Sequence, residues 1–421
     1  MYYEEKLDNG LLLSSIRDER DIERYAAFNS EFNNANEGIN SDLLIRRFPG
    51  ATYDDYLFIE DTHTGQVVAT ICLIPWQFSF EGIAQRAAQL ELVLSHPKYR
   101  RQGLVKILIK RFKQMVVECQ YDLSFIWGIP YYYRQYGYAY CIEDSTFESL
   151  PIWRIPDALE CETGAYKLRK AVLEDVPVLT EIYHNAMQSL QFYTLRSQEH
   201  WKYLLEWAKF PVQVVEDQRT RHAAGYIGLG KQTYNTSVQI FESGITNQEV
   251  GFAVLRALKA EVGGEIQVSW PQNSTLARLA RSLGSVTLPG SQWLLHIPDP
   301  AGFLAKIGPA IEQRLAASDC KDLTEDLTIN LFRQAFRLRF KSGKLVGVDA
   351  MGFVDSSMGA DGGDLCIPPE AFVRLLLGYR GLDELRDAWP DIVLKAKSRH
   401  MVDVLFPKIA SYFTPTYNYF G

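Results

Sequence analysis

The run from Leu92 to Val105 constrains the fold more than any other stretch, because it joins a strand to a helix through a short turn. It reads Leu-Val-Leu-Ser-His-Pro-Lys-Tyr-Arg-Arg-Gln-Gly-Leu-Val: an apolar strand, a proline-containing turn, two arginines and a glycine. A helix over residues 104–119 is predicted next, because apolar residues recur there at helical spacing: Leu104, Val105, Leu108, Phe112, Met115 and Val116. A strand that leads directly into an amphipathic helix is typical of an α/β fold.

The start of this helix has the properties of an anion site. The first amides of a helix have no partner within it, and the helix dipole adds partial positive charge there. Gly103 has no side chain to keep a phosphate from the backbone, and Arg100 and Arg101 add full charges. Between Lys98 and Lys113 the chain has seven Lys or Arg and no acid, although its net charge is -7. Such a basic segment on an acidic protein predicts an anionic ligand.

Arg100-Arg-Gln-Gly-Leu-Val105 resembles the Arg/Gln-x-x-Gly-x-Gly/Ala signature of the GNAT acetyltransferase superfamily, with Val105 in place of the final small residue. The resemblance implies that amides of the turn hold the pyrophosphate of acetyl-CoA, the cosubstrate, and the residues concerned are Arg100, Arg101, Gln102, Gly103, Leu104 and Val105. It also implies a sheet splayed at the preceding strand, where free backbone groups of Val93, Leu94 and Ser95 meet the pantetheine. An amide near Val93 would stabilise the oxyanion.

A second motif lies downstream. Residues 122–128 predict a short buried strand, and Tyr132-Tyr-Arg-Gln-Tyr-Gly-Tyr138 follows it. This segment is similar to the GNAT pattern aromatic-Tyr-x-x-x-Gly-aromatic, which implies that Tyr133 protonates the departing thiolate. A phenol suits that role because it can donate a proton yet stays neutral near pH 7. The alternative is that the tyrosines of this segment only pack together.

The first 150 residues predict strands and helices around a mixed sheet, in the order of a GNAT domain. Strands are expected at 11–17, 56–60, 66–75, 87–94, 122–128 and 138–147, with a helix opened by Asp21 and a hairpin turn at Thr64-Gly65.

Residues 151–297 predict the same order again. Strands are expected at 166–169, 225–229, 237–243 and 264–270, with helices from Glu174, over 250–260 and over 273–284. The segment before the helix at 250–260 has no arginine, and Glu249 would repel a pyrophosphate. We interpret this part as a GNAT-like domain without a CoA site, which walls the substrate cleft.

Residues 298–421 predict a different order of helices and strands from the two preceding parts. A helix is expected over 298–317, one strand over 327–340 that turns at Ser342-Gly343, a loop over 352–364 and a helix over 368–378. This third resembles the sterol-carrier-protein-like α+β domain that ends proteins of the enhanced-intracellular-survival (Eis-like) acetyltransferase family, in which two GNAT modules precede it. The resemblance covers essentially the whole chain and implies a ring-like homo-oligomer, such as a hexamer.

Two groups are candidates for the base that takes a proton from the substrate amine. In the resembling family it is the terminal carboxylate, which implies Gly421 here, one residue beyond the aromatic residue, Phe420, at which members usually end. A terminal carboxylate has a reference pKa of about 3.5, so it would need burial or a water relay. The other is Glu91, which strand alternation places on the face of Gln89 and Val93.

Composition excludes several classes of protein. No apolar run approaches the roughly eighteen residues of a membrane span, and the N-terminus lacks a signal-peptide layout. The six cysteines are scattered, which predicts reduced, buried thiols in the cytoplasm, and no histidines stand at metal-ligand spacing, so no metal is expected. A pI near 5.6 argues against a nucleic-acid partner.

The sequence therefore predicts an N-acetyltransferase that moves acetyl from acetyl-CoA to a small-molecule primary amine by direct attack. The resemblance and the acidic charge favour an aminoglycoside or another polyamine-like acceptor, with the substrate-binding residues Phe28, Glu31, Phe32 and Phe420. Two alternatives remain open: a non-catalytic protein that binds an apolar ligand and has a regulatory CoA site, and a metabolic acetyltransferase with one substrate.

Overall fold

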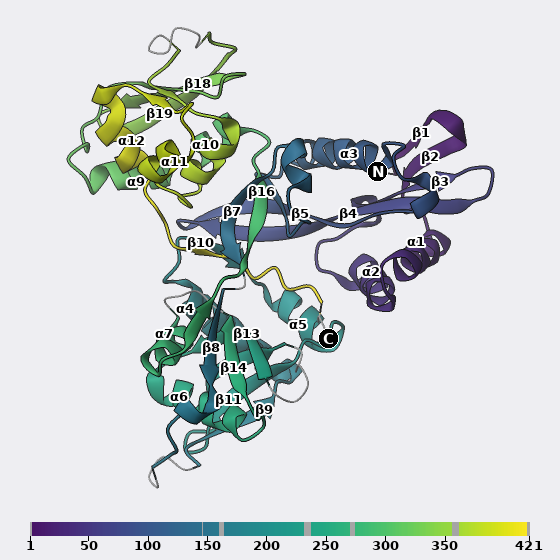
Figure 1. The fold of residues 1–421 in the computed structure, drawn as a ribbon, viewed down its shortest axis with the longest axis vertical. Helices are drawn as coiled ribbons and strands as arrows, with labels where there is room; N and C mark the ends of the chain where they lie inside the picture. Colours follow the sequence, from purple (N-terminus) through teal and green to yellow (C-terminus); the bar gives the residue numbers. More distant parts are fainter. Residues whose placement is uncertain are drawn as a thin grey trace.

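The computed structural model describes residues 2–144, 146–159, 164–230, 237–269, 274–355 and 362–418. The strands of these residues form sheets of ten, seven and five strands, and parallel and antiparallel pairs occur within each sheet. Figure 1 shows the three sheets in three bodies, with the last segment of the chain passing from the third body back between the first two. The expected mixed-sheet α/β architecture is confirmed.

The first sheet has the strand order β1-β2-β3-β4-β5-β6-β16-β7, and β10 and β22 extend it beside the second half of β4. Its strands are β1 (Glu4–Lys6), β2 (Leu11–Ser15), β3 (Tyr56–Asp61), β4 (Gln66–Phe80), β5 (Ile83–Ser95), β6 (Leu123–Ile126), β7 (Ala139–Asp144), β10 (Phe192–Leu195), β16 (Ser291–His296) and β22 (Ser411–Tyr412). The predicted turn between β3 and β4 is confirmed, since the Gly65 amide donates to the Asp61 carbonyl at 2.7 Å.

Helices cover both faces of this sheet. Helices α1 (Glu19–Phe32) and α2 (Ala35–Arg47) pack on one face, and α3 (Leu104–Glu118) packs on the other with the apolar stripe that the sequence predicted. Helix α1 begins one turn earlier than expected. Its N-cap is Asp18, whereas Asp21 is buried in an ion pair with Arg17.

The second sheet has the order β15-β8-β14-β13-β12-β11-β9. Its strands are β8 (Phe147–Pro151), β9 (Tyr166–Lys170), β11 (Val212–Asp217), β12 (Ala223–Leu229), β13 (Ser237–Ile245), β14 (Glu265–Ser269) and β15 (Val286–Leu288). The helices of this part are α4 (Val176–Met187), α5 (Gln198–Glu206), α6 (Gln248–Lys259) and α7 (Thr275–Ser282). Elements β10, α5, β11, β15 and β16 are additional to the order predicted for residues 151–297.

The first two sheets exchange strands. Strand β8, from the end of the predicted first domain, lies between β14 and β15 of the second sheet, while β16 lies between β6 and β7 of the first. Sheet membership thus cuts across the boundaries that the sequence placed near residues 150 and 297. The exchange ties the two sheets together through backbone hydrogen bonds.

The third sheet has the order β19-β18-β17-β20-β21. Its elements are β17 (Leu327–Asn330), β18 (Ala335–Lys341), β19 (Lys344–Gly352), β20 (Leu365–Cys366), β21 (Val393–Leu394), α8 (Pro300–Lys306), α9 (Gly308–Ala316), α10 (Pro369–Leu376), α11 (Leu382–Ala388) and α12 (Arg399–Leu405).

Two predictions for this part are wrong. The helix over 298–317 is two helices, because Pro309 lacks an amide hydrogen and starts a new helix after Ile307. The strand over 327–340 is two strands, β17 and β18, which pair across a tight turn where Phe332 has φ 65°. Apolar residues continue through this turn, so the alternation of apolar and polar residues did not reveal that the strand ends there.

The cysteines also depart in part from expectation. Cys72, Cys141 and Cys366 are buried, but Cys119 is exposed and Cys320 is half-buried. The sixth cysteine predicted to be a buried thiol, Cys161, lies outside the described residues. None of the helices among the described residues is both long and apolar enough to cross a membrane.

Candidate active site

Strand β5 is the element on which the candidate site is built. It pairs with β4 along one edge, but on the other edge it pairs with β6 only from Ala87 to Gln89. Beyond Gln89, the backbone groups on that edge have no strand partner among the described residues. Val93, Leu94 and Ser95, which the sequence predicted to meet pantetheine, are half-buried and belong to this unpaired stretch.

A β-bulge in β5 changes which face its side chains take. Leu92 has φ 52°, and around it β5 contains one residue more than β4. Before the bulge, Gln89 and Glu91 share a face, and the Gln89 amide donates to the Glu91 carboxylate at 3.1 Å. After the bulge the alternation inverts, so that Leu92 packs with α1 and α2 while Val93 packs with α3. The prediction that Val93 shares the face of Glu91 is wrong, because strand periodicity does not reveal a bulge.

The turn between β5 and α3 presents free amides. Gly103 is the N-cap of α3 in the left-handed region, with φ 80° and no side chain to cap the helix. Within the described residues, the amides of residues 101–106 donate no hydrogen bond, and Arg100 and Arg101 are exposed and form no ion pair. A Cβ placed on Gly103 would meet nothing within 4 Å, so the turn faces open space. These features are those of an anion site.

Tyr133 lies in the short 3-10 helix η4 (Tyr132–Tyr136) that follows β6. Only 6% of Tyr133 is exposed, and its hydroxyl makes no hydrogen bond to any described residue. Its ring fits against Gly128, where a Cβ would approach the ring to 2.2 Å, so a side chain at position 128 would displace it. Burial, and next the negative charge of Glu91, raise the pKa of Tyr133 above that of an ordinary phenol. The hydroxyl therefore stays protonated at neutral pH.

Glu91 is the acidic group that faces this region from β5. Burial raises the pKa of Glu91 to about 7, and the nearby charge of Glu37 on α2 acts in the same direction. Hydrogen bonds from Gln89 and Tyr417 partly oppose the shift. A carboxyl with this pKa is a suitable general base near neutral pH.

The residues predicted to bind the acceptor occupy different environments. Phe28 is 4% exposed and packs against Phe32 with ring centroids 5.0 Å apart, and Phe32 in turn packs on His96 with ring centroids 4.6 Å apart. Glu31 is exposed. Phe32 and Glu31 thus keep surface for a ligand, whereas Phe28 belongs to the core. Phe420 and Gly421 lie outside the described residues.

The C-terminal segment is held against the candidate site by the second body. Arg196, which follows β10, forms a bidentate ion pair with Glu242 of β13 at 2.6 and 2.9 Å, and their side chains are 0% and 1% exposed. The same guanidinium donates to the Thr414 carbonyl at 3.2 Å. Local sequence contains no signal for this arrangement, because its members come from three distant segments.

The next residues of the tail are held by helix α5. The His200 ring lies 2.6 Å from the Thr416 carbonyl, and the Tyr203 hydroxyl donates to the Tyr417 carbonyl at 2.8 Å. Burial, and next the charge of Arg196, lower the pKa of His200 to about 3, so the ring is neutral and its Nε2–H donates. The tail thereby places Tyr417 beside Glu91.

A family model described as an acetyltransferase (GNAT) domain matches residues 22–141. Three solved structures are similar to nearly the whole chain. One is a conserved protein of unknown function from Enterococcus faecalis V583, described as a probable N-acyltransferase, with TM-score 0.72 and 14% identity over 97% of this chain and 100% of that one.

The second is a GCN5-related N-acetyltransferase from Anabaena variabilis, with TM-score 0.71 and 13% identity over 97% of this chain and 100% of that one. The third is Eis1 from Mycobacterium abscessus, with TM-score 0.64 and 15% identity over 96% of this chain and 99% of that one. At these identities the likeness is one of fold. No curated protein matches the sequence.

Proposed function

We propose that this protein is an N-acetyltransferase that transfers acetyl from acetyl-CoA to a primary amine by direct attack. One observation carries the proposal: the free amides of residues 101–106 and the unpaired edge of β5 lie in one continuous segment, with the protonated Tyr133 nearby. The turn would bind the pyrophosphate, and the strand edge would bind pantetheine as an additional strand. The GNAT match over residues 22–141 supports this assignment.

The reaction follows from these positions. The amine nitrogen attacks the thioester carbonyl, and a backbone amide near Val93 stabilises the oxyanion that forms. The C–S bond then breaks, the CoA thiolate takes the proton of Tyr133, and the nitrogen gives its own proton to a base. The products are the acetylated amine and CoA, and solvent restores the proton of Tyr133.

Glu91 is the base that the described residues favour, because its raised pKa of about 7 allows it to accept a proton near neutral pH. The carboxylate of Gly421 remains the other candidate. The tail supports this second possibility in one respect, since the side chain of Tyr417, near the end of the described residues, forms a hydrogen bond with Glu91.

The acceptor that we propose is an aminoglycoside or another polyamine-like molecule, bound in part by Glu31 and Phe32. The net charge of -7 supports a polycationic substrate. We further propose the Eis-like arrangement of domains: a catalytic GNAT domain over 1–150, a GNAT-like domain without CoA over 151–297 and a sterol-carrier-protein-like domain over 298–421. A cytoplasmic homo-oligomer, such as a hexamer, belongs to the same proposal.

The test is acetyl-CoA consumption, followed by thiol release, against a panel of aminoglycosides, polyamines and lysine peptides. Turnover of several aminoglycosides that Tyr133→Phe abolishes is the expected result. CoA binding without turnover of any amine would instead favour the non-catalytic alternative, in which an apolar ligand occupies the third domain.

A further inference from the structure

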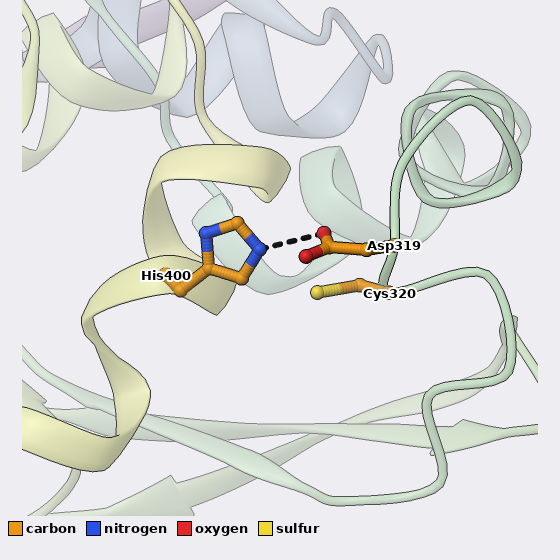
Figure 2. Close-up of side chains that lie close together, drawn as sticks. All are labelled: Asp319, Cys320 and His400. Atoms are coloured by element: carbon orange, nitrogen blue, oxygen red, sulfur yellow. Dashed lines mark hydrogen bonds and ion pairs between the residues drawn. The ribbon is translucent and has the colours of Figure 1, made fainter.

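The third body contains a cluster of three different ligand types at its surface. Asp319 and Cys320 lie in the turn after α9, and His400 lies in the first turn of α12. Figure 2 shows the three side chains directed toward one another across the space between this turn and α12. The carboxylate Oδ1 of Asp319 is 2.7 Å from Nε2 of His400, and the three donor atoms all lie within 4.8 Å of one another.

The sequence did not predict this cluster. Asp319 and His400 are 81 positions apart, and the histidines show no metal-ligand spacing along the chain. Packing of α12 against α9 brings the two segments together. Cys320 was expected to be a buried thiol, but it is half-buried, and its two neighbours in the cluster are exposed.

The combination of donors selects a class of metal. Thiolate and imidazole ligands favour zinc and other borderline-soft ions, whereas magnesium and calcium require oxygen ligands. Bond lengths of about 2.0–2.3 Å in a tetrahedral zinc site place neighbouring ligand atoms roughly 3.3–3.8 Å apart. The Asp319 and His400 donor atoms lie closer than that spacing, and no pair among the three exceeds 4.8 Å, so small side-chain rotations bring all three to it. Water has access to the fourth position.

The surroundings also favour a cation. The turn follows the C-terminal end of α9, where the helix dipole is negative. Among the described residues, the only ion-pair partner of Asp319 is His400, so no lysine or arginine competes for the carboxylate. The amide of Cys320 donates to the Ser318 hydroxyl at 3.0 Å, which fixes the turn that carries two of the ligands.

We propose that Asp319, Cys320 and His400 bind one Zn²⁺, with water as the fourth ligand. On binding, the Cys320 thiol releases its proton to solvent, and the sulfur forms a bond to the metal. The ion joins the turn after α9 to α12 and stabilises the third body. The ion lies in the third body, whereas the acyl-transfer site lies in the first. This proposal therefore stands whether or not the chain transfers an acyl group.

The experiment uses the full chain, reduced and freed of metal with a chelator. Co²⁺ is added as a spectroscopic probe, because a cysteine ligand gives an intense thiolate-to-cobalt absorption, and Zn²⁺ is then added to displace it. One equivalent of Co²⁺ should produce this band, and Zn²⁺ should remove it. Cys320→Ser should lack the band, and His400→Ala should weaken Zn²⁺ binding by at least about tenfold.

Cys119→Ser is the matched control, because the Cys119 thiol is exposed but lies at the end of α3, outside the cluster. It should bind cobalt as the wild type does. Zn²⁺ should also raise the Tm of the wild type by more than that of His400→Ala at the same concentration, which distinguishes weakened binding from misfolding. Absence of the band in the wild type, or its persistence in Cys320→Ser, would overturn the proposal.

Discussion

The first and second sheets contain the same local arrangement of strands and helix, but the two helices differ at their N-terminal ends. In each, a strand pairs in parallel with the next over only part of its length, and a helix joins the two: α3 between β5 and β6, and α6 between β13 and β14. Helix α3 begins at Gly103 with free amides and no acid in its first turn. Helix α6 begins at Asn247, whose side chain accepts from the Val250 amide, and it has Glu249 in its first turn.

The acidic residues on the two central strands differ in the same way. Glu91 of β5 has a raised pKa and no cationic partner among the described residues, whereas Glu242 of β13 is paired with Arg196. The same strand–helix–strand topology therefore occurs in two chemically different settings. Free amides and an unpaired acid suit ligand chemistry, whereas a capped helix and a neutralised acid suit structural support, here of the C-terminal tail.

The largest effect is expected from Gly103→Glu, which gives α3 an acid like that of α6. Acetyl-CoA affinity should fall by at least about 100-fold, because charge-assisted hydrogen bonds of roughly 1.5–3 kcal/mol each are lost and repulsion is added. Calorimetric titration with CoA measures the change. Gly103→Ala is the control for the φ of 80°, and it should lose much less affinity. Equal losses in both variants would attribute the effect to backbone strain rather than charge.

Tyr133→Phe tests the chemical step separately from binding. Loss of a general acid should lower kcat by roughly 100-fold or more, with CoA affinity unchanged. Steady-state kinetics with the best acceptor of the panel and CoA titration give the two quantities. Tyr132→Phe is the matched control, since that neighbouring hydroxyl bonds to Tyr136. Unchanged turnover in Tyr133→Phe would remove this residue from the mechanism.

Arg196→Met tests the supporting role of the second sheet. It leaves Glu242 buried without a partner, which should cost about 3–5 kcal/mol in the free energy of unfolding. Urea denaturation measures the loss, and the double variant Arg196→Met with Glu242→Gln should recover much of it. Activity should also fall in the single variant, because Arg196 holds Thr414. A single variant as stable as the double would contradict the structural role of this pair.

The pH profile distinguishes the two candidate bases. If Glu91 accepts the proton, it must be ionised, so kcat/KM should rise as pH increases through about 7, its folded-state pKa. In Glu91→Gln this limb should disappear and the rate should fall. A terminal carboxylate with an ordinary pKa of about 3.5 would give no such limb. A wild-type profile that is flat around pH 7 would therefore favour Gly421.

The smallest effect is expected from the reverse change, Asn247→Gly with Glu249→Gly, which frees the first turn of α6. Calorimetry should still give one CoA per chain, because this segment has no equivalent of Arg100 and Arg101. Binding of a second CoA would mean that the cap and the acid alone account for the difference in CoA binding between α3 and α6, and that the arginines are dispensable.

Much of the candidate site could be predicted because its features are local. The turn at Gly103, the stripe of α3 and the segment around Tyr133 each depend on residues within a few positions of one another. The bulge at Leu92 could not be predicted, since one extra residue changes register without changing composition. The same limit explains the hidden turn at Phe332 and the exchange of β8 and β16.

The sequence by itself determined the start of α3 at Gly103, the hairpin turn at Gly65 and the free amides of residues 101–106, because backbone hydrogen bonding there is decided by near neighbours. Only the tertiary structure decided the pKa of Glu91, the burial of Arg196 with Glu242, and the meeting of Asp319 and Cys320 with His400. These properties depend on which distant segments exclude water from a group or approach it. Desolvation and contact across the fold are absent from any short stretch of sequence.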